Sequence, residues 1–288
     1  MSILLDGKTP VVVQGITGRV GRAQTHWMLD YGTNIVAGVT PGRGGMEVEG
    51  VPVFDTVREA REKRGAQASV FFVPAAAVAE TLYETIDAGI ELIVVVTEHI
   101  PVHDVMRLRH YARQKRCTVL GPTTPGILTP GEAKMGIMPG ALFSRGPVGI
   151  VSRSGTLSYE IGGNLRSAGI GQSTVVGMGA DPVVFTNLPE ILSLFQADTE
   201  TRIIVVVGEV GGVQEEMAAE FIRDHVSKPV VAYIAGRHTP EGKRMGHAGA
   251  LIQRGMGNAR SKIEALTRAG VAVSETPAGV VDIVRKLL

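Results

Sequence analysis

The sequence is poor in several features that would each point to a particular class of protein. Cysteine occurs once among 288 residues, at position 117. A disulfide within the chain and a metal cluster bound by several thiolates are therefore excluded. No apolar run reaches the roughly 18 residues that a membrane-spanning helix needs. The N-terminus lacks a basic segment followed by a long apolar core, so it does not resemble a secretory signal. We therefore expect a cytoplasmic protein with no membrane segment.

An excess of charge of one sign is also lacking. Lys and Arg number 29 against 28 for Asp and Glu, which gives a net charge of +1. This balance gives no support for a nucleic acid or a membrane surface as partner. A local basic cluster at 107–116 is interpreted as the solvated face of a helix. No Walker-type Gly-Lys-Ser/Thr loop and no cluster of acidic residues is present, so we expect no metal site in this chain.

Short apolar runs rich in β-branched residues alternate with segments of helical period along most of the chain. Strands that are apolar on both faces are typical of parallel sheets covered by helices on both sides. The alternation predicts a doubly wound α/β fold. We predict strands at 11–13, 35–39, 69–73, 92–96, 118–120, 148–151, 173–176, 203–207, 230–235 and 271–273, and helices at 22–31, 75–88, 104–115, 158–168 and 215–226.

Two irregular stretches interrupt this alternation. The first, 121–147, is rich in Gly and Pro and has no clear helix, so we interpret it as the connection between two α/β domains. The predicted domains are residues 1–125 and 148–288, joined by a connecting segment at 126–147. The second stretch, 236–257, lies inside the second domain, where a loop of that length is usually functional or disordered.

A glycine-rich turn follows the first predicted strand. Gly15, Gly18 and Gly21 lie between a strand and a helix, where backbone N–H groups and the helix dipole favour a phosphate. The second strand runs into Thr40-Pro41-Gly42-Arg43 and lacks the acid that an NAD ribose usually needs. Arg43 instead suits a ribose that carries a phosphate. NADP and coenzyme A both fit, and a turn without ligand beside a solvated arginine is the non-functional alternative.

One of the seven histidines stands out because small residues flank it on both sides. Lys243 and Arg244 precede His247 by four and three positions and could attract an anion. Neutral imidazole is a competent nucleophile near pH 7 when its other ring nitrogen is oriented. Glu209 is the candidate for that role, because it follows a predicted strand and ligands bind at the carboxyl ends of strands in open α/β sheets. A loop histidine that contacts solvent is the alternative on these residues alone.

A second strand-to-helix turn has the composition of a phosphoryl site. The predicted strand 148–151 leads into Ser152-Arg153-Ser154-Gly155-Thr156, and a helix follows. A helix N-terminus favours an anion, so Ser154, Gly155 and Thr156 are candidate phosphate-binding residues. A plain N-cap by the hydroxyl of Ser154 or Thr156 is equally compatible with the pattern.

Taken together, these motifs resemble those of the succinyl-CoA synthetase α subunits, and the resemblance spans essentially the whole chain. Two long blocks, 149–157 and 243–250, are highly specific. The resemblance implies a Rossmann-like CoA-binding domain followed by a flavodoxin-like ligase domain, in a cytoplasmic enzyme of the tricarboxylic acid cycle. Shorter blocks that support it lie at 14–18, 38–42, 50–54, 97–98 and 208–209.

The resemblance also implies a role for each motif. His247 carries a phosphoryl group, Glu209 orients it, and Tyr159 faces the organic acid. ATP or GTP with Mg²⁺ binds mainly to a separate β subunit of ATP-grasp type, in an αβ or (αβ)₂ assembly. The reaction forms succinyl-CoA reversibly from succinate and CoA through an acyl phosphate. The residues implied to bind CoA are Thr17, Gly18, Arg19, Val20, Arg43, Val96, Thr97 and Glu98.

Several positions depart from the family's usual residues. Arg43 replaces a lysine and keeps its charge, whereas His99 and Ala180 replace glycines and Thr123-Thr124 replaces Asn-Cys. Because Ala180 and the two threonines lie in loops near the expected acid and CoA positions, a related ligase for malate or citrate is an alternative. A CoA-binding regulator without activity would need neither His247 nor its carboxylate partner. An NADP-dependent oxidoreductase would need an acid–base constellation for hydride transfer, which is not apparent.

Overall fold

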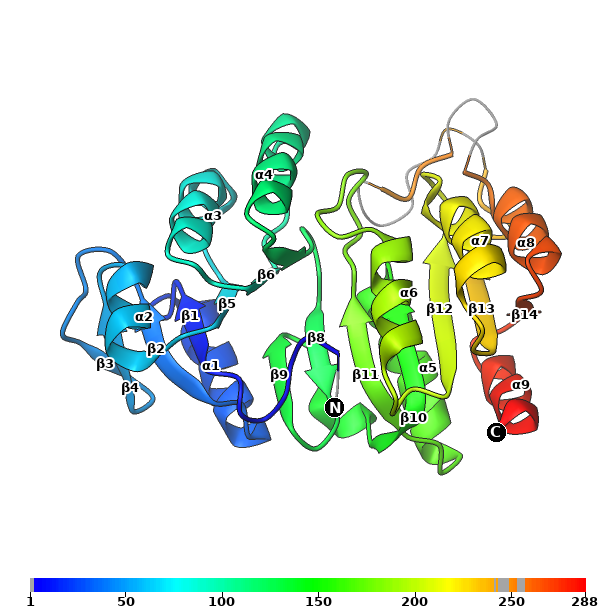
Figure 1. Ribbon diagram of the computed structural model, residues 1–288, viewed down its shortest axis with the longest axis horizontal. Coiled ribbons are helices and arrows are strands. Elements are labelled where there is room, and N and C mark those ends of the chain that lie inside the picture. Colours follow the sequence, from blue (N-terminus) through cyan, green and yellow to red (C-terminus); the bar gives the residue numbers. More distant parts are fainter. Residues whose placement is uncertain (1–2, 241, 243–248, 253–256) are drawn as a thin grey trace. The chain divides into compact units, whose positions relative to one another are not determined.

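The chain divides into two compact units, and the computed structural model describes residues 3–240, 242, 249–252 and 257–288. The N-terminal unit comprises Leu4–Met138 and Val183–Phe185, and the C-terminal unit comprises Ile3, Pro139–Pro182 and Thr186–Leu288. In Figure 1 the first unit runs from blue to green and the second from green to red. Each unit contains a mainly parallel sheet with helices, which confirms the predicted α/β class.

The sheet of the N-terminal unit has the strand order of a Rossmann fold. In order across the sheet, its strands are β3 (Glu47–Val48), β4 (Val51–Phe54), β2 (Ile35–Val39), β1 (Val11–Gln14), β5 (Ala68–Phe71), β6 (Leu92–Val95) and β7 (Thr118–Leu120). β3 pairs antiparallel with β4, and the pairs among the others are parallel. Without β3 the order is the 3-2-1-4-5-6 arrangement. The second and third strands are added on one side of the first strand and the next three on its other side, so the order of the strands reverses there. That reversal creates a crevice at the carboxyl end of β1.

Helices cover this sheet and close its core. They are α1 (Arg19–Tyr31), α2 (Val57–Arg64), the short 3₁₀ helix η1 (Ala75–Ala77), α3 (Val78–Asp87) and α4 (Val102–Gln114). α2, α3 and α4 pack in series, and their apolar faces meet the strands in a buried cluster that includes Phe71, Leu82 and Leu108. α2 was not predicted because its sequence is mostly charged. It begins where the Thr56 hydroxyl accepts a hydrogen bond from Glu59 N–H, and ends at Gly65, with a φ of +69°.

The stretch expected as a connecting segment contains regular structure. β8 (Gly126–Thr129) and β9 (Ala133–Gly136) form an antiparallel hairpin, and the 3₁₀ helix η2 (Gly140–Leu142) follows. A Cβ at Gly126 would lie 1.9 Å from the carbonyl oxygen of Met135. The glycines that suggested a loop therefore allow two backbones to approach closely. The compact units divide between Met138 and Pro139, inside the expected connection at 126–147.

The C-terminal unit contains five parallel strands in flavodoxin order. Across the sheet they are β11 (Gln172–Gly177), β10 (Arg145–Ser152), β12 (Ile203–Glu209), β13 (Val230–Ala235) and β14 (Ala272–Ser274). The pairs are parallel, and numbered along the chain the order is 2-1-3-4-5. The carboxyl ends of β10 and β12 are therefore neighbours at the point where the order reverses. The predicted flavodoxin-like arrangement is confirmed.

The helices of the C-terminal unit form two layers. They are α5 (Gly155–Ser167), α6 (Leu188–Ala197), α7 (Gln214–His225), α8 (Ala259–Arg268) and α9 (Gly279–Leu287). α6, α7 and α8 pack side by side, whereas α5 packs with α9 on the other face (Figure 1). Asn187 and Asn258 cap α6 and α8, two helices that we did not predict although their capping residues were visible in the sequence. Within the described part of the chain, no helix combines the length and apolarity that crossing a membrane requires.

Candidate functional site

The glycine-rich turn of the N-terminal unit places a helix start directly after β1. Gly15 has a φ of +74°, and a Cβ there would lie 2.7 Å from the carbonyl oxygen of Phe72. A Cβ at Gly21 would lie 2.1 Å from the carbonyl oxygen of Gly15. Gly18 is the N-cap of α1 and provides no side-chain cap. The first-turn N–H groups are therefore suited to an anionic ligand.

A cavity of about 670 Å³ opens at this turn, at the carboxyl ends of β1, β2 and β5. Its volume lies within the roughly 300–1,000 Å³ of typical ligand pockets. Thr17 and Thr40, from the first two of these strand ends, approach with their hydroxyl oxygens 3.2 Å apart. The predicted residues Thr17, Gly18, Arg19 and Val20 all line the cavity, together with Glu80, Thr81 and Glu84 of α3. The α3 residues were missed, because a helix that follows a strand does not show in its sequence which turn faces the crevice.

The other predicted CoA-binding residues lie at the edge of this arrangement. Arg43 is exposed in the turn after β2, where its N–H donates to the carbonyl of Thr40 at 3.1 Å. Thr97 donates through its hydroxyl to the carbonyl of Val73, a lining residue, at 2.8 Å. This bond ties Val96, Thr97 and Glu98, which follow β6, to the cavity wall.

The threonines that replace the family's usual residues belong to a turn near this segment. Thr123 N–H donates to the carbonyl of Thr97 at 3.2 Å. Thr124 is buried, and its hydroxyl accepts a hydrogen bond from Gly126 N–H at 2.9 Å. Thr124 thus stabilises the turn that leads into β8.

In the C-terminal unit, Glu209 lies at the carboxyl end of β12 and is buried. Its carboxylate Oε1 lies 3.7 Å from Nε of Arg153, an ion-pair distance. Its backbone N–H donates to Oε1 of Glu215 at 3.1 Å. Glu209 is therefore held from both its backbone and its side chain at the sheet edge where ligands bind in this fold.

Arg153, which the sequence reasoning did not select, is the centre of this region. Its guanidinium is buried, and Nη1 donates to the carbonyl of Gly211 at 2.7 Å and to Oε1 of Glu215 at 3.1 Å. Nη1 also donates to the carbonyl of Glu209 at 3.2 Å, and Nη2 to the carbonyl of Gly249 at 3.5 Å. Burial lowers the pKa of Arg153, but attraction by Glu215 and Glu209 outweighs this and raises it, so the guanidinium stays charged.

Glu215 and Lys262 complete a buried ion cluster behind Arg153. Both side chains are fully buried, and the Lys262 ammonium contacts Oε2 of Glu215. Lys262 also donates to the carbonyl of Gly212 at 3.0 Å and to Oε2 of Glu216 at 3.2 Å. Burial raises the pKa of Glu215, but Arg153 and Lys262 outweigh this and hold it below its ordinary value. Neither residue carried a signal in the sequence, because α7 and α8 show no sign of which charged position is buried.

The start of α5 is organised by its own hydroxyl groups. The Ser154 hydroxyl accepts a hydrogen bond from Leu157 N–H at 3.4 Å, which is the capping arrangement considered as an alternative. The Ser152 hydroxyl accepts from Ser154 N–H at 3.1 Å, and the Ser154 and Thr156 hydroxyl oxygens lie 3.4 Å apart. Tyr159 follows on the same helix, and burial raises the pKa of its hydroxyl to about 12. That hydroxyl therefore stays protonated near neutral pH.

His247, with Lys243 and Arg244, lies outside the described residues. The nearest described residue after it, Gly249, donates through its N–H to the carbonyl of Ala180 at 3.1 Å. A Cβ at Gly249 would lie 2.2 Å from that carbonyl oxygen and 3.2 Å from Nη2 of Arg153. Residue 249, two positions after His247, is thus packed against the turn that carries Arg153.

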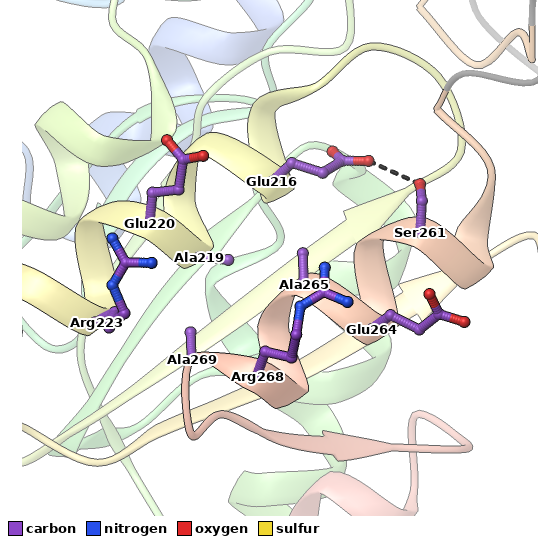
Figure 2. Close-up of a pocket in the computed structure, with 9 residues that line it drawn as sticks. All are labelled: Glu216, Ala219, Glu220, Arg223, Ser261, Glu264, Ala265, Arg268 and Ala269. Carbon is purple, nitrogen blue, oxygen red and sulfur yellow. Dashed lines mark hydrogen bonds between the residues drawn. The ribbon is translucent and has the colours of Figure 1, made fainter.

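A separate cavity of about 360 Å³ lies between α7 and α8 (Figure 2). Small side chains, among them Ala219 and Ala265, lie between charged ones, and Ser261 donates to Glu216 at 2.9 Å. None of the predicted site residues in the described part of the chain lines this cavity. No group of His, Cys, Asp or Glu side chains suited to a metal ion occurs among the described residues.

Comparisons with known proteins agree with the two-unit arrangement. The family model of the CoA binding domain matches residues 6–99, and that of the CoA-ligase matches residues 151–272. The succinate–CoA ligase [ADP-forming] subunit alpha 2 of Archaeoglobus fulgidus is 54% identical and covers 100% of both chains. The succinate–CoA ligase [ADP-forming] subunit alpha of Aquifex aeolicus is 53% identical over 100% of this chain and 95% of its own.

Solved structures with the same fold belong to longer proteins. ATP citrate lyase from Methanothrix soehngenii, in complex with citrate and coenzyme A, matches with a TM-score of 0.87 at 25% identity. The match covers 99% of this chain and 52% of the lyase chain, so this chain spans about half of that protein. A dinucleotide-forming acetyl-coenzyme A synthetase 1 from Ca. Korarchaeum cryptofilum matches with a TM-score of 0.75 at 21% identity, over 97% of this chain and 61% of its own. This second likeness shows a shared fold.

Proposed function

The chain belongs to the family of succinate–CoA ligase α subunits, and we propose on that premise that it forms succinyl-CoA reversibly from succinate, CoA and a nucleoside triphosphate. One observation carries the proposal. In the C-terminal unit, residue 249, two positions after His247, packs against Arg153, which also contacts Glu209 and directly precedes the start of α5. Gly249, Glu209 and the start of α5 therefore meet around Arg153, which supports a site for His247 at this sheet edge.

We propose that the N-terminal unit binds CoA in the cavity of about 670 Å³ beside α1. The first-turn N–H groups of Arg19 and Val20 suit a phosphate of the nucleotide moiety, because a helix N-terminus favours negative charge. Arg43, in the adjacent exposed turn, supplies a cation for the ribose phosphate. Thr97 holds the segment 96–98 against the same wall.

The proposed chemistry splits one hard step into easier ones. An imidazole nitrogen of His247 attacks the terminal phosphorus of the nucleoside triphosphate, and the nucleoside diphosphate leaves. A succinate carboxylate oxygen then takes the phosphoryl group, which frees the imidazole and gives an acyl phosphate. The CoA thiolate attacks the acyl carbon, and inorganic phosphate leaves. Glu209 orients the imidazole, Ser154, Gly155 and Thr156 provide the helix start for the phosphoryl group, and Tyr159 faces the acid.

The nucleotide and its Mg²⁺ belong, in this proposal, to a β subunit of ATP-grasp type. The names of the relatives as α subunits support a partner chain, and their ADP-forming activity favours ATP over GTP. We propose a cytoplasmic αβ or (αβ)₂ enzyme.

Phosphorylation of the reconstituted complex tests the proposal. Intact mass after incubation with ATP or GTP and Mg²⁺ is expected to show one added phosphoryl group on the wild-type chain and none on His247→Ala. Equal labelling of both chains would remove His247 as the carrier. A Glu209→Gln chain is expected to label more slowly and to bind CoA normally, because Glu209 lies in the C-terminal unit.

The identity of the acid is tested separately. Ala180 stands where the family usually has glycine, and its carbonyl contacts residue 249, so this substitution lies in the same unit as the proposed phosphoryl carrier. Thioester formation from succinate, malate and citrate should be compared in the complete complex. Succinate is expected to give the highest kcat/KM, and a higher value for malate or citrate would assign the chain to that related ligase.

A further inference from the structure

We propose that Arg153 is a positioning residue for phosphoryl transfer, and that Glu215 and Lys262 hold it in place. Arg153 fixes the backbone on both sides of the proposed site, at Gly211 after β12 and at Gly249 after His247. The inference rests on the proposed function, since it concerns the segment that carries the phosphoryl group.

The contacts of Arg153 assign it this role in preference to binding phosphate. Its Nη1 faces two backbone carbonyls and the Glu215 carboxylate, its Nη2 faces the carbonyl of Gly249, and its Nε faces Glu209. Every guanidinium nitrogen is thus directed at an oxygen of the protein. The side chain is only 4% exposed, which also leaves little surface for a ligand.

Glu215 fixes the guanidinium from behind. Its Oε1 accepts from Arg153 and from the backbone N–H of Glu209, and its Oε2 contacts the Lys262 ammonium. One carboxylate therefore joins the end of β12, the turn after β10 and the helix α8. A planar, forked guanidinium can bridge several such acceptors at once, which a lysine ammonium on a flexible stem does less well.

The glycines of this region allow the close approaches that the cluster needs. A Cβ at Gly208 would lie 2.7 Å from Oε1 of Glu215, and a Cβ at Gly211 would lie 1.9 Å from the carbonyl oxygen of Gly249. There is therefore no room for a side chain beside the Glu215 carboxylate at position 208 or beside the Gly249 carbonyl at position 211. A displacement of about 1 Å at a reacting group costs on the order of 100-fold in rate. A small shift of residue 249 would act in this way on His247, which precedes it by two positions in the sequence.

The decisive variant is Arg153→Lys in the complete complex. This substitution keeps a positively charged side chain of similar length and removes the forked guanidinium, which can donate to several acceptors at once. We expect the rate of His247 phosphorylation by ATP, followed by quenched intact-mass analysis, to fall by at least about ten-fold. KM for CoA and for the acid, and the Kd for CoA measured by calorimetry, should stay within about two-fold, because the contacts of the Arg153 side chain described above are with Glu209, Gly211, Glu215 and Gly249, and Arg153 does not line the cavity beside α1. A phosphorylation rate within about three-fold of wild type would overturn the proposal.

A second pair of variants separates positioning from stability. Glu215→Gln leaves the Lys262 cation without its buried carboxylate partner, and the double variant Glu215→Gln/Lys262→Met removes that cation as well. We expect the double variant to regain Tm relative to Glu215→Gln while its phosphorylation stays at least about ten-fold slow. If the double variant recovered both its Tm and its phosphorylation rate, the cluster would serve stability alone. If Arg153→Lys does not fold, the phosphorylation rate of the double variant tests the proposal instead. A fall of at least about ten-fold supports it, and a rate within about three-fold of wild type overturns it.

A matched control and the wild type complete the test. Lys134, in the N-terminal unit, is 5% exposed and donates to the carbonyl of Met138 at 3.1 Å. Lys134→Met therefore removes a buried lysine with no link to the cluster and should phosphorylate at the wild-type rate. If the wild-type complex itself takes up no phosphoryl group, the proposed function fails, whatever the variants do. If it labels and Arg153→Lys labels equally well, only the positioning role fails.

Discussion

The two units build their candidate sites in different ways. The N-terminal unit presents a turn of backbone at the start of α1, where Gly15 and Gly21 leave no room for a side chain. The C-terminal unit presents charged side chains in its interior, where Glu215 contacts both Arg153 and Lys262. Backbone N–H groups at a helix start are sufficient to hold a phosphate. Transfer of a phosphoryl group depends on positioning, and the buried cluster provides it.

The difference predicts how each site fails when it is altered. Buried ion pairs contribute little net stability compared with apolar replacements, but the loss of one partner is costly because a charge is left uncompensated. The C-terminal site should therefore be sensitive to single charge changes. The N-terminal site should be sensitive to added atoms at its glycines and tolerant of changes in the side chains around them.

The largest expected effect is on the stability of the C-terminal unit in Glu215→Gln. We expect a loss of about 3–5 kcal/mol in the free energy of unfolding at pH 7, because Arg153 and Lys262 lose a shared carboxylate. The pKa of Glu215 is lowered in the fold, so its contribution is present above its unfolded pKa of about 4.3 and is lost as the pH falls through the folded value. Denaturant unfolding of the wild type and of Glu215→Gln should show that the difference in their free energy of unfolding becomes smaller below about pH 4. A difference independent of pH would contradict this assignment.

The next effect concerns the close approach beside residue 249. Gly211→Ala would place a Cβ 1.9 Å from the carbonyl oxygen of Gly249, at a φ of +91°. We expect phosphorylation of His247 to slow by at least about 100-fold, with CoA affinity unchanged. Gly169→Ala is the matched control, since Gly169 has a φ of +76° and nothing lies within 4 Å of its Cβ position. Equal losses in both variants would mean that backbone strain, and not the contact with residue 249, causes the effect.

The corresponding change in the N-terminal unit is Gly15→Ala. Its Cβ would lie 2.7 Å from the carbonyl oxygen of Phe72, so the turn must shift and the cavity wall with it. Calorimetry should show CoA affinity reduced by at least about ten-fold, whereas phosphorylation of His247 by ATP should proceed normally. Gly65→Ala, with a φ of +69° and open space around its Cβ, is the control. Loss of phosphorylation in Gly15→Ala would mean that the two sites do not fail separately.

The smallest effect is expected for Arg43→Gln, because Arg43 is exposed. A charge-assisted hydrogen bond to a ribose phosphate at such a position should account for about five-fold to ten-fold in CoA affinity. Dephospho-CoA, which lacks that phosphate, should bind the wild type and Arg43→Gln with equal affinity. An equal loss for both ligands would assign Arg43 a role in shaping the turn at 40–46.

Much of the fold could be predicted because its signals are local. Each predicted strand overlaps an observed one, and the glycine-rich turn does lead from β1 into a helix, but α1 begins at Arg19, so Gly21 lies in its first turn and not before it. α2 was missed because its charged sequence has no apolar run. The hairpin at 126–136 was missed because glycines that permit close backbone contact resemble glycines of a loop. The strand orders required the tertiary structure, since the sequence alone does not say which strands become neighbours.

The sequence by itself determined the alternation of strands and helices, the glycine turn before α1 and the small-residue turn before α5. It did so because periodicity, glycine and helix capping act over a few residues. Only the tertiary structure decided that Arg153, Glu215 and Lys262 form one buried cluster. Glu215 and Lys262 are 47 positions apart, and each looks like an ordinary surface charge in its own helix. A charge is buried only where a partner from elsewhere in the chain compensates it, and the fold supplies that partner.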